Sequence, residues 1–117
     1  MRIPVLLTNL EFVGQAEGDR LTYYVFKGPA SYLVVSAGSR GGLNVNIVEA
    51  EAPGVILARF GGAQVTSKLL GKAGRRPDLF GESFGRLNSL YVMVALGKAK
   101  KLKKREGKAM VFKIAKR

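Results

Sequence analysis

The most constraining feature of the sequence is a segment with helical spacing that is apolar on nearly every side. Around 84-FGRLNSLYVMVAL-96, apolar residues recur mostly three, four or seven positions apart, at Phe84, Leu87, Tyr91, Val94, Ala95 and Leu102. This is the spacing of one helix face. Val92, Met93 and Leu96 lie outside that stripe. A helix covered by one sheet needs a single apolar face, so either the small domain wraps this helix or a second subunit covers it near Met93 and Leu96.

The chain has the size of one domain. It contains 117 residues, of which 47% are hydrophobic, so it can bury a core, unlike a disordered polybasic protein. The longest uninterrupted apolar run, 90-LYVMVAL-96, is far shorter than the roughly 20 residues of a membrane-spanning helix. The N-terminus shows no cleavable signal pattern. We therefore expect a single cytoplasmic domain over residues 1–117.

The first sixty residues favour β-strands. Runs of β-branched and aromatic residues are separated by Gly and Pro, which is typical of strands and turns. These runs predict strands at 2–13, 21–28, 31–36, 43–52 and 55–60. In the fourth run Leu43, Val45 and Ile47 alternate with Asn44 and Asn46. The alternation predicts an apolar face toward the core and a wet polar face.

The second half favours a helix that continues into the basic end of the chain. A short helix within 64–74 has Thr66 or Ser67 as its N-cap, and the long helix begins after Asp78 or Ser83. We expect an α+β fold in which an antiparallel sheet of about five strands packs on one long C-terminal helix, followed by a final short strand. Along this single domain, the strand-rich part is 1–62, the helical and basic part is 63–107 and the terminal strand is 109–115.

Few residues are available for catalysis or metal binding. The sequence has no histidine and no cysteine, and among its carboxylates only Glu49 and Glu51 are considered as a pair. Residues two apart on a strand share a face, so this pair allows a hydrolase or an Mg²⁺ site as a minor alternative. Solvated carboxylates near a strand end are far more common. We predict that the protein is not an enzyme and has no metal or cofactor.

The net charge is +12, and nearly all of it belongs to one end of the chain. Residues 71–117 hold fourteen of the 20 basic residues and three of the 8 acidic ones. A polyanion-binding surface produces such an asymmetry. Clustered like charges repel each other, and a surface that only keeps the protein soluble would not need to cluster them. Lys and Arg neutralise phosphates without reading sequence. The predicted nucleic-acid-binding residues are Lys98, Lys100, Lys101, Lys103, Lys104, Arg105 and Lys108, with Arg75, Arg76, Arg40 and Arg59.

Single-stranded nucleic acid also requires aromatic side chains on which unpaired bases stack. Tyr23, Tyr24, Phe26 and Tyr32 lie on two neighbouring predicted strands, and alternation sends some of them to the face away from the core. Strand aromatics are more often core residues or cross-strand pairs, so the choice among Tyr23, Tyr24 and Tyr32 stays open. Asn and Gln are nearly absent among the lysines, which favours binding without base readout.

The layout of the chain resembles a known family. A strand-rich first half with 21-LTYYVFKG-28, the segment 84-FGRLNSLYVMVALGKAKKLKKREG-107 and the ending 109-AMVFKIAKR-117 are similar to the ThermoDBP-related single-stranded DNA-binding proteins of archaea. The absence of cysteine and the scarcity of glutamine beside abundant Lys and Arg also indicate a thermophile. The resemblance implies DNA binding without sequence preference, in a basic cleft with apolar and aromatic walls, and assembly into oligomers.

Single-stranded DNA binding by a homo-oligomer is therefore the leading hypothesis. The first alternative is an RNA-binding or ribosome-associated protein whose basic end contacts A-form backbone and loops. The second is an interaction module that docks an acidic protein partner on the apolar helix. We expect no membrane partner.

Overall fold

The first half of the chain forms a four-stranded antiparallel sheet. The computed structural model describes residues 10–38 and 40–116, so most of the strand predicted at 2–13 lies outside the described residues. Each strand pairs with the next along the chain, in the order β1 (Glu11–Glu17), β2 (Thr22–Lys27), β3 (Ser31–Ala37) and β4 (Leu43–Glu49). Strands β1 and β4 are therefore the two edges of this sheet.

The second half contains the helices and a second antiparallel sheet. Its elements are α1 (Ala52–Phe60), β5 (Gln64–Val65), α2 (Ser67–Ala73), α3 (Pro77–Phe80), α4 (Ser83–Ala95), β6 (Ala99–Glu106) and β7 (Ala109–Ile114). Its strands pair in the order β5-β7-β6. Along the chain, the second half therefore runs through a helix, a short strand, three helices and a two-stranded hairpin, and α4 is the last helix before the hairpin.

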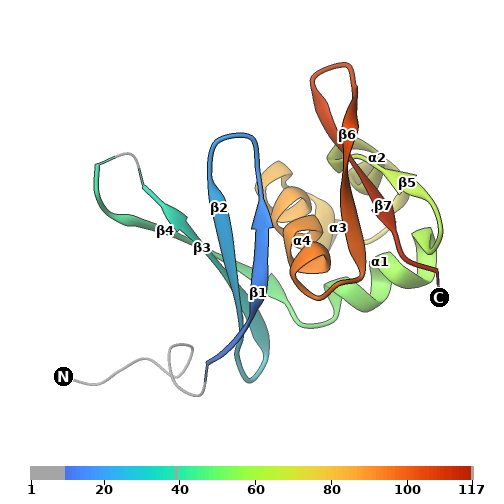
Figure 1. Cartoon of the computed structure of the whole chain (residues 1–117). Coiled ribbons are helices and arrows are strands. Elements are labelled where there is room, and N and C mark those ends of the chain that lie inside the picture. The colour runs from blue at the N-terminus through green and yellow to red at the C-terminus, as the bar shows by residue number, and fades with distance from the viewer. Residues whose placement is uncertain (1–9, 39, 117) are drawn as a thin grey trace.

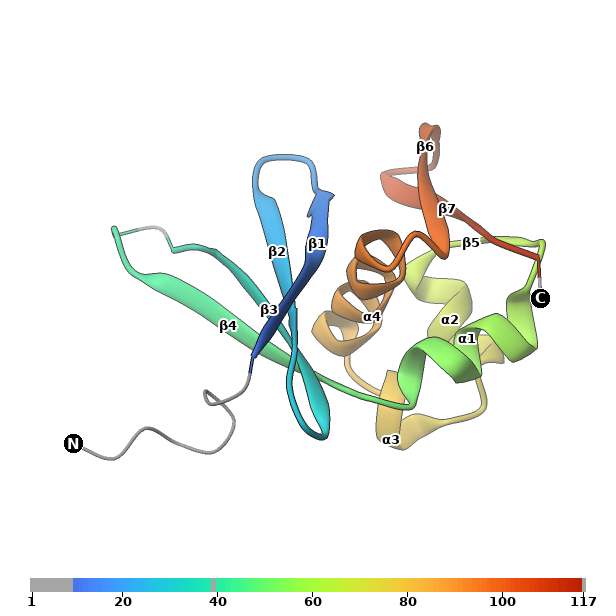
Figure 2. The same cartoon turned by 60° about the horizontal axis from the view of Figure 1, so that its bottom comes forward.

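Helix α4 lies at the centre of the molecule, between the four-stranded sheet and the other helices (Figures 1 and 2). Tyr91 and Met93 pack in one core with Val25 of the first sheet and Phe112 of the second. The domain itself therefore wraps the helix, which is the first of the two alternatives raised by its sequence. Met93 is completely buried in its own chain and Leu96 is half-buried beside the core, so this fold leaves no subunit contact at Met93.

The expected long C-terminal helix is wrong, because α4 ends before the basic run. The last turn closes in a Schellman motif: the amide of Gly97 donates to the carbonyl of Val94 at 3.0 Å, and the amide of Lys98 donates to that of Met93 at 2.9 Å. Gly97 has a φ of +74°, a left-handed conformation that glycine adopts without steric cost. The lysine-rich segment, expected to continue the helix to 107, forms β6 instead.

The basic run forms a strand because the following residues supply its partner. Gly107, with a φ of +62°, and Lys108 connect β6 to β7, and a glycine at the first position is what a type II′ hairpin turn requires. Strand β7 places Phe112 and Ile114 in the core. The terminal strand expected at 109–115 is present as β7. The described residues nevertheless form seven strands in two sheets, not one sheet of about five strands on a long helix.

The strand predicted at 55–60 is also wrong, because these residues form a helix. Residues 55–60 belong to α1, which has Pro53 in its first turn, where the fixed φ of proline suits a helix start. A short apolar run does not by itself distinguish a buried strand from a buried helix. The short helix expected within 64–74 is confirmed as α2, and its N-cap is Thr66, whose side-chain oxygen accepts from the amide of Leu69 at 3.2 Å.

Strand β4 is present, but its two faces are reversed from the expectation. Leu43, Val45 and Ile47 are 72, 50 and 51% exposed, whereas Val48 is buried. The register with β3 places Val48 opposite Tyr32, and both residues belong to the core beside α4. The more apolar face of β4 therefore points away from the core.

A close approach between β1 and α4 requires glycine at position 14. The pairing of β1 with β2 is irregular between Phe12 and Gly14, and a Cβ built on Gly14 would lie 2.7 Å from the carbonyl oxygen of Ala95. Glycine alone lets the strand backbone come this close to the last turn of the helix. The contact holds edge strand β1 beside the segment that leads into β6.

Candidate nucleic-acid interface

Most of the predicted lysines come together on one hairpin, formed by β6, its turn and β7, which we call the basic hairpin. It projects from the second half of the molecule (Figure 1). Its exposed cations include Lys100, Lys103, Lys104, Arg105 and Lys108, while Lys101 is half-buried and Lys98 is exposed in the turn before β6. In the described part of the chain no carboxylate pairs with any of these six lysines. Their positive charge is therefore left uncompensated.

A groove of about 610 Å³ lies between β6 and edge strand β1; we call it the β1–β6 groove. It is lined by Lys101, Lys103 and Arg105 from β6, by Gln15 and Glu17 from β1, and by Val94 and Leu102. The groove thus combines a cationic wall, a polar wall and an apolar part. Its volume falls within the range of roughly 300 to 1,000 Å³ that is usual for ligand sites.

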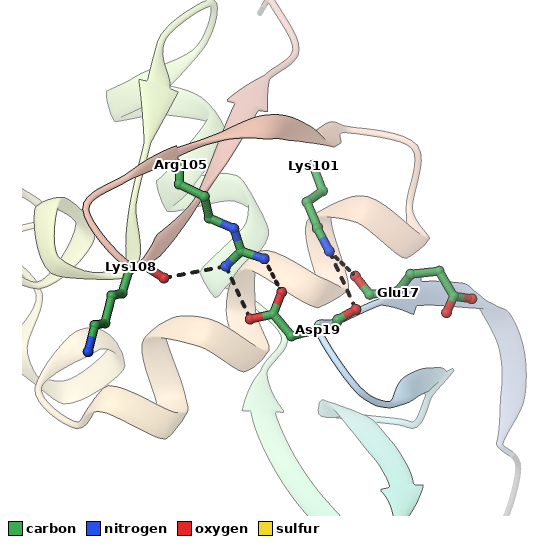
Figure 3. A network of polar contacts seen from close by, with 6 residues as sticks. Glu17, Asp19, Lys101, Arg105 and Lys108 are labelled. Atoms are coloured by element: carbon green, nitrogen blue, oxygen red, sulfur yellow. Dashed lines mark hydrogen bonds and ion pairs between the residues drawn. The ribbon is translucent and has the colours of Figure 1, made fainter.

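A polar network joins the basic hairpin to the turn between β1 and β2 (Figure 3). The guanidinium of Arg105 donates to the carboxylate of Asp19 through both terminal nitrogens, with Nη1 3.1 Å from Oδ2. The Nζ of Lys101 donates to the carbonyl oxygens of Glu17 and Gly18 at 3.3 and 3.4 Å. These contacts join residues 83 to 86 positions apart in the sequence. They hold the hairpin beside the first sheet and so shape the groove.

The pair of Asp19 and Arg105 predicts a loss of stability in acid. The hydrogen bond from Arg105 lowers the pKa of Asp19 from 3.8, because it favours the carboxylate form. A carboxyl whose pKa is lower in the folded chain stabilises the fold above pH 3.8 and loses this contribution as the pH falls through the folded-state pKa. We expect Asp19→Asn to flatten the decline of the melting temperature below about pH 4, measured by circular dichroism. Equal declines in the two proteins would contradict this expectation.

A second group of lysines lies on the three-stranded sheet, on the face away from the β1–β6 groove. The register of β6 and β7 puts Lys100 directly opposite Lys113, and with Lys116 they line a shallow pocket of about 220 Å³. We call these three residues the lysine patch. Like charges directly opposite on neighbouring strands repel each other, and a bound anion relieves that repulsion. Lys113 is not among the sequence candidates, although the alternation with Phe112 and Ile114 is the signal that places it outside.

The three candidate tyrosines do not share one surface. Tyr32 is buried, and the ring of Tyr23 stacks on that of Tyr91 in α4 with 4.1 Å between centroids. Both therefore lie on the face toward the helix. Tyr24 lies on the opposite, outer face and is 43% exposed. The expected division of these aromatic residues between two faces is confirmed, and Tyr24 is the tyrosine most accessible to a ligand.

Tyr24 belongs to a group of aromatic residues on the outer face of β1 and β2. Phe12 and Phe26 are paired in register on this face, with their rings in edge contact at 5.5 Å between centroids. We call Phe12, Tyr24 and Phe26 the aromatic platform. Tyr24 pairs across the strands with Gln15, and Gln15 also lines the β1–β6 groove. Platform and groove are therefore continuous. Sequence reasoning missed Gln15 because the predicted strand ended at residue 13. It missed Phe12 because aromatic candidates were considered only on the two strands that hold Tyr23, Tyr24, Phe26 and Tyr32.

The four predicted site arginines outside the basic run do not line this groove. Arg76 donates to Asp78 and to Glu51, each with a contact of 2.8 Å. The bonds to Asp78 and Glu51 raise the pKa of Arg76, and Arg76 in turn lowers the pKa of Asp78. The other three, Arg40, Arg59 and Arg75, are exposed in the β3–β4 loop, the last turn of α1 and the connection from α2 to α3. These four positions remain scattered surface charges.

The carboxylates considered for catalysis are not assembled into one site. Glu51 accepts a hydrogen bond from Arg76, and Glu49 lines a pocket that does not include Glu51. Within residues 10–38 and 40–116, the structure contains no group of three or more acidic residues placed to hold a metal ion. No helix in this part of the chain is long and apolar enough to cross a membrane.

The candidate site combines the cationic wall of the basic hairpin, the β1–β6 groove and the aromatic platform. Its parts come from β1, β2 and β6, which lie at the two ends of the described sequence and meet only in the folded chain. Comparison with protein-family models, curated proteins and solved structures found no significant match to this chain.

Proposed function

We propose that this protein binds single-stranded nucleic acid, in the first place DNA, without sequence preference. The observation that carries the proposal is the continuity of platform and groove through Gln15, which pairs with Tyr24 and lines the groove. Unpaired bases stack on aromatic rings, and Lys and Arg neutralise the phosphates that connect the bases. In the proposed complex, bases lie on the aromatic platform and the backbone follows Lys101, Lys103 and Arg105.

The burial of α4 supports a single strand over a duplex. A helix that reads a duplex enters the major groove and presents polar side chains to base edges. The polar residues Asn88 and Ser89 of α4 are buried, and they donate to the carbonyls of Phe84 and Gly85 at 2.8 and 2.7 Å. The four-stranded sheet and the other helices pack against α4, which keeps these two polar side chains out of reach of a major groove. The same cover argues against docking of an acidic protein on α4.

RNA is the second candidate ligand. Stacking and phosphate contacts are common to single-stranded DNA and RNA. The lysine patch extends the cationic surface to the other face of the hairpin, beyond the groove. This wider distribution of charge suits a folded RNA with A-form backbone and loops.

A fluorescence-anisotropy titration tests the proposal. Labelled single-stranded DNA, duplex DNA and RNA of equal length are each titrated at several salt concentrations. We expect single-stranded DNA to bind most tightly, because stacking requires unpaired bases, and its affinity to fall steeply with the logarithm of salt. Weak, salt-independent binding of all three ligands would remove the proposal. Preference for RNA would transfer it to the second candidate.

The contribution of stacking is tested at Tyr24. We expect Tyr24→Ala to weaken single-strand binding by about 1 to 3 kcal/mol, roughly five- to 150-fold in Kd, because it removes the base-stacking surface. The salt dependence should stay unchanged, since no charge is altered. Tyr24→Phe, which keeps the ring, is the matched control and should bind like the wild type. Unchanged affinity in Tyr24→Ala would mean that the lysines act without the platform.

A further inference from the structure

The four-stranded sheet has an open edge at β4. This strand is last in the sheet order, and both views show it as the outermost strand, with no described element along its free side (Figures 1 and 2). It is seven residues long and pairs with β3 along its whole length without an irregularity. Such an edge offers free N–H and C=O groups to another strand.

The features that usually protect an edge are present at β1 and missing from β4. Proteins protect edge strands with lysine, proline or a bulge, or cover them with another element. Strand β1 has an irregularity after Phe12 and lies against α4 at Gly14. The sequence of β4, 43-LNVNIVE-49, contains no proline and no basic residue, and Val45 and Ile47 are half exposed. Within residues 10–38 and 40–116 no strand pairs with the free side of β4, so this edge can pair with another strand.

We propose that β4 is the contact between two copies of this chain, which pair edge to edge in antiparallel orientation and join their sheets. The strand is self-complementary about Asn46, which would face Asn46 of the partner subunit across a two-fold axis. In the same register Val45 faces the partner's Ile47, and Ile47 faces the partner's Val45. Two apolar pairs then form on the outer face, and two amides meet on the face toward α4.

The charge distribution also favours β4 as the place where two copies of the chain meet. Two molecules of net charge +12 repel each other, so they associate most readily where their cations are far apart. Strand β4 contains Glu49 and no cation. The basic hairpin lies on the other side of α4 from this edge (Figure 2). Pairing at β4 therefore keeps the two basic hairpins at opposite ends of the dimer.

Edge pairing also has a consequence for the surface of the dimer. A two-fold axis normal to the joined sheets puts both outer faces on the same side. The two aromatic platforms then share one surface of an eight-stranded sheet. The inference itself rests on the open edge and its symmetry, and it stands independently of the proposed nucleic-acid binding.

Light scattering coupled to size-exclusion chromatography tests the dimer. We expect the wild-type mass to rise toward that of a dimer with concentration, and Val45→Lys or Ile47→Glu to stay monomeric, because each puts an unpaired charge into an apolar pair. The double variant Val45→Lys/Ile47→Glu should recover the dimer, since lysine then faces glutamate twice. Phe84→Lys changes an exposed apolar residue outside β4 and should dimerise like the wild type. Circular dichroism confirms that each variant is folded.

An introduced cysteine tests the register, because the chain has none of its own. Directly opposite residues of antiparallel strands have Cα atoms about 4.5 to 5.5 Å apart, which a disulfide can span. We expect Asn46→Cys to give a cross-linked dimer on a non-reducing gel after mild oxidation. Asn44→Cys faces the partner's Val48 and should remain a single chain. Cross-linking at position 44 instead would overturn this register, and a monomeric wild type without cross-linking at 46 would overturn the dimer.

Discussion

Replacing Lys103 and Lys104 by glutamate is expected to weaken the binding of single-stranded DNA by roughly tenfold or more at low salt. Both side chains are exposed on the basic hairpin, and no carboxylate pairs with them in residues 10–38 and 40–116. Each phosphate contact of a single strand contributes a slope of about 0.7 to the dependence of log affinity on log salt. If both lysines contact phosphates, that slope should shrink by about 1.4. Anisotropy titrations over a salt series measure both quantities.

A matched charge reversal on another surface is the control for this experiment. Lys68 and Lys72 are exposed on α2, and replacing both by glutamate changes the net charge by the same amount. Because long-range attraction depends on total charge, this control should lose some affinity while keeping its salt slope. Equal losses of affinity and slope in the two double variants would show that the hairpin is not the contact surface.

Met93→Ala is expected to lower the free energy of unfolding by about 2 to 5 kcal/mol, because it leaves a cavity in the core. Met93 is completely buried, in the core shared by both sheets and the helices. The substitution acts on the fold of a single chain. The mass of the assembly in solution at a given concentration should therefore not change while the variant is folded. Urea denaturation followed by circular dichroism gives the free energy, and light scattering gives the mass.

Leu96→Ala is the companion to this substitution. Leu96 is half-buried at the end of α4, so its truncation removes less buried apolar surface and should cost less than that of Met93. A loss of dimer without a loss of stability in Met93→Ala would contradict the burial of this residue and return the subunit contact to α4.

The packing of both sheets and the other helices around α4 bears most directly on which surface could bind nucleic acid. A helix that reads duplex DNA presents polar side chains to the major groove. Here Asn88 and Ser89 are buried and bonded to their own helix backbone, so the helix stabilises the domain. In the proposed complex, nucleic acid contacts the basic hairpin and the platform on the outer face of β1 and β2. Proposed binding therefore depends on two elements at opposite ends of the chain.

Local patterns predicted those elements whose identity depends on neighbouring residues. Strands β2 and β3 follow from their β-branched and aromatic content, and the start of α2 follows from the cap at Thr66. Residues 55–60 could not be assigned in this way, because a short apolar run suits a buried strand and a buried helix equally well. The lysine-rich β6 was mistaken for helix because its inward side is completed by Phe112 and Ile114, which lie on β7.

In the candidate site, too, some features follow from local sequence patterns and others depend on tertiary contacts. The charge asymmetry and the separation of Tyr23 from Tyr24 follow from counting residues and from the two-residue period of a strand. The groove does not, because Gln15 and Lys101 become neighbours only through pairing and packing over more than 80 residues. The position of Arg105 gives the reason, because it depends on an ion pair with Asp19. No local sequence pattern connects these two residues.

By itself, the sequence determined that this chain buries a core, that its second half carries the positive charge and that one helix has to be covered on nearly every side. These are properties of composition and of short periods, which act between residues close along the chain. The tertiary structure alone decided what covers the helix, that the helix ends before the basic run and which face of β4 meets water. Those outcomes depend on which strand pairs with which, and pairing is set by contacts between distant residues.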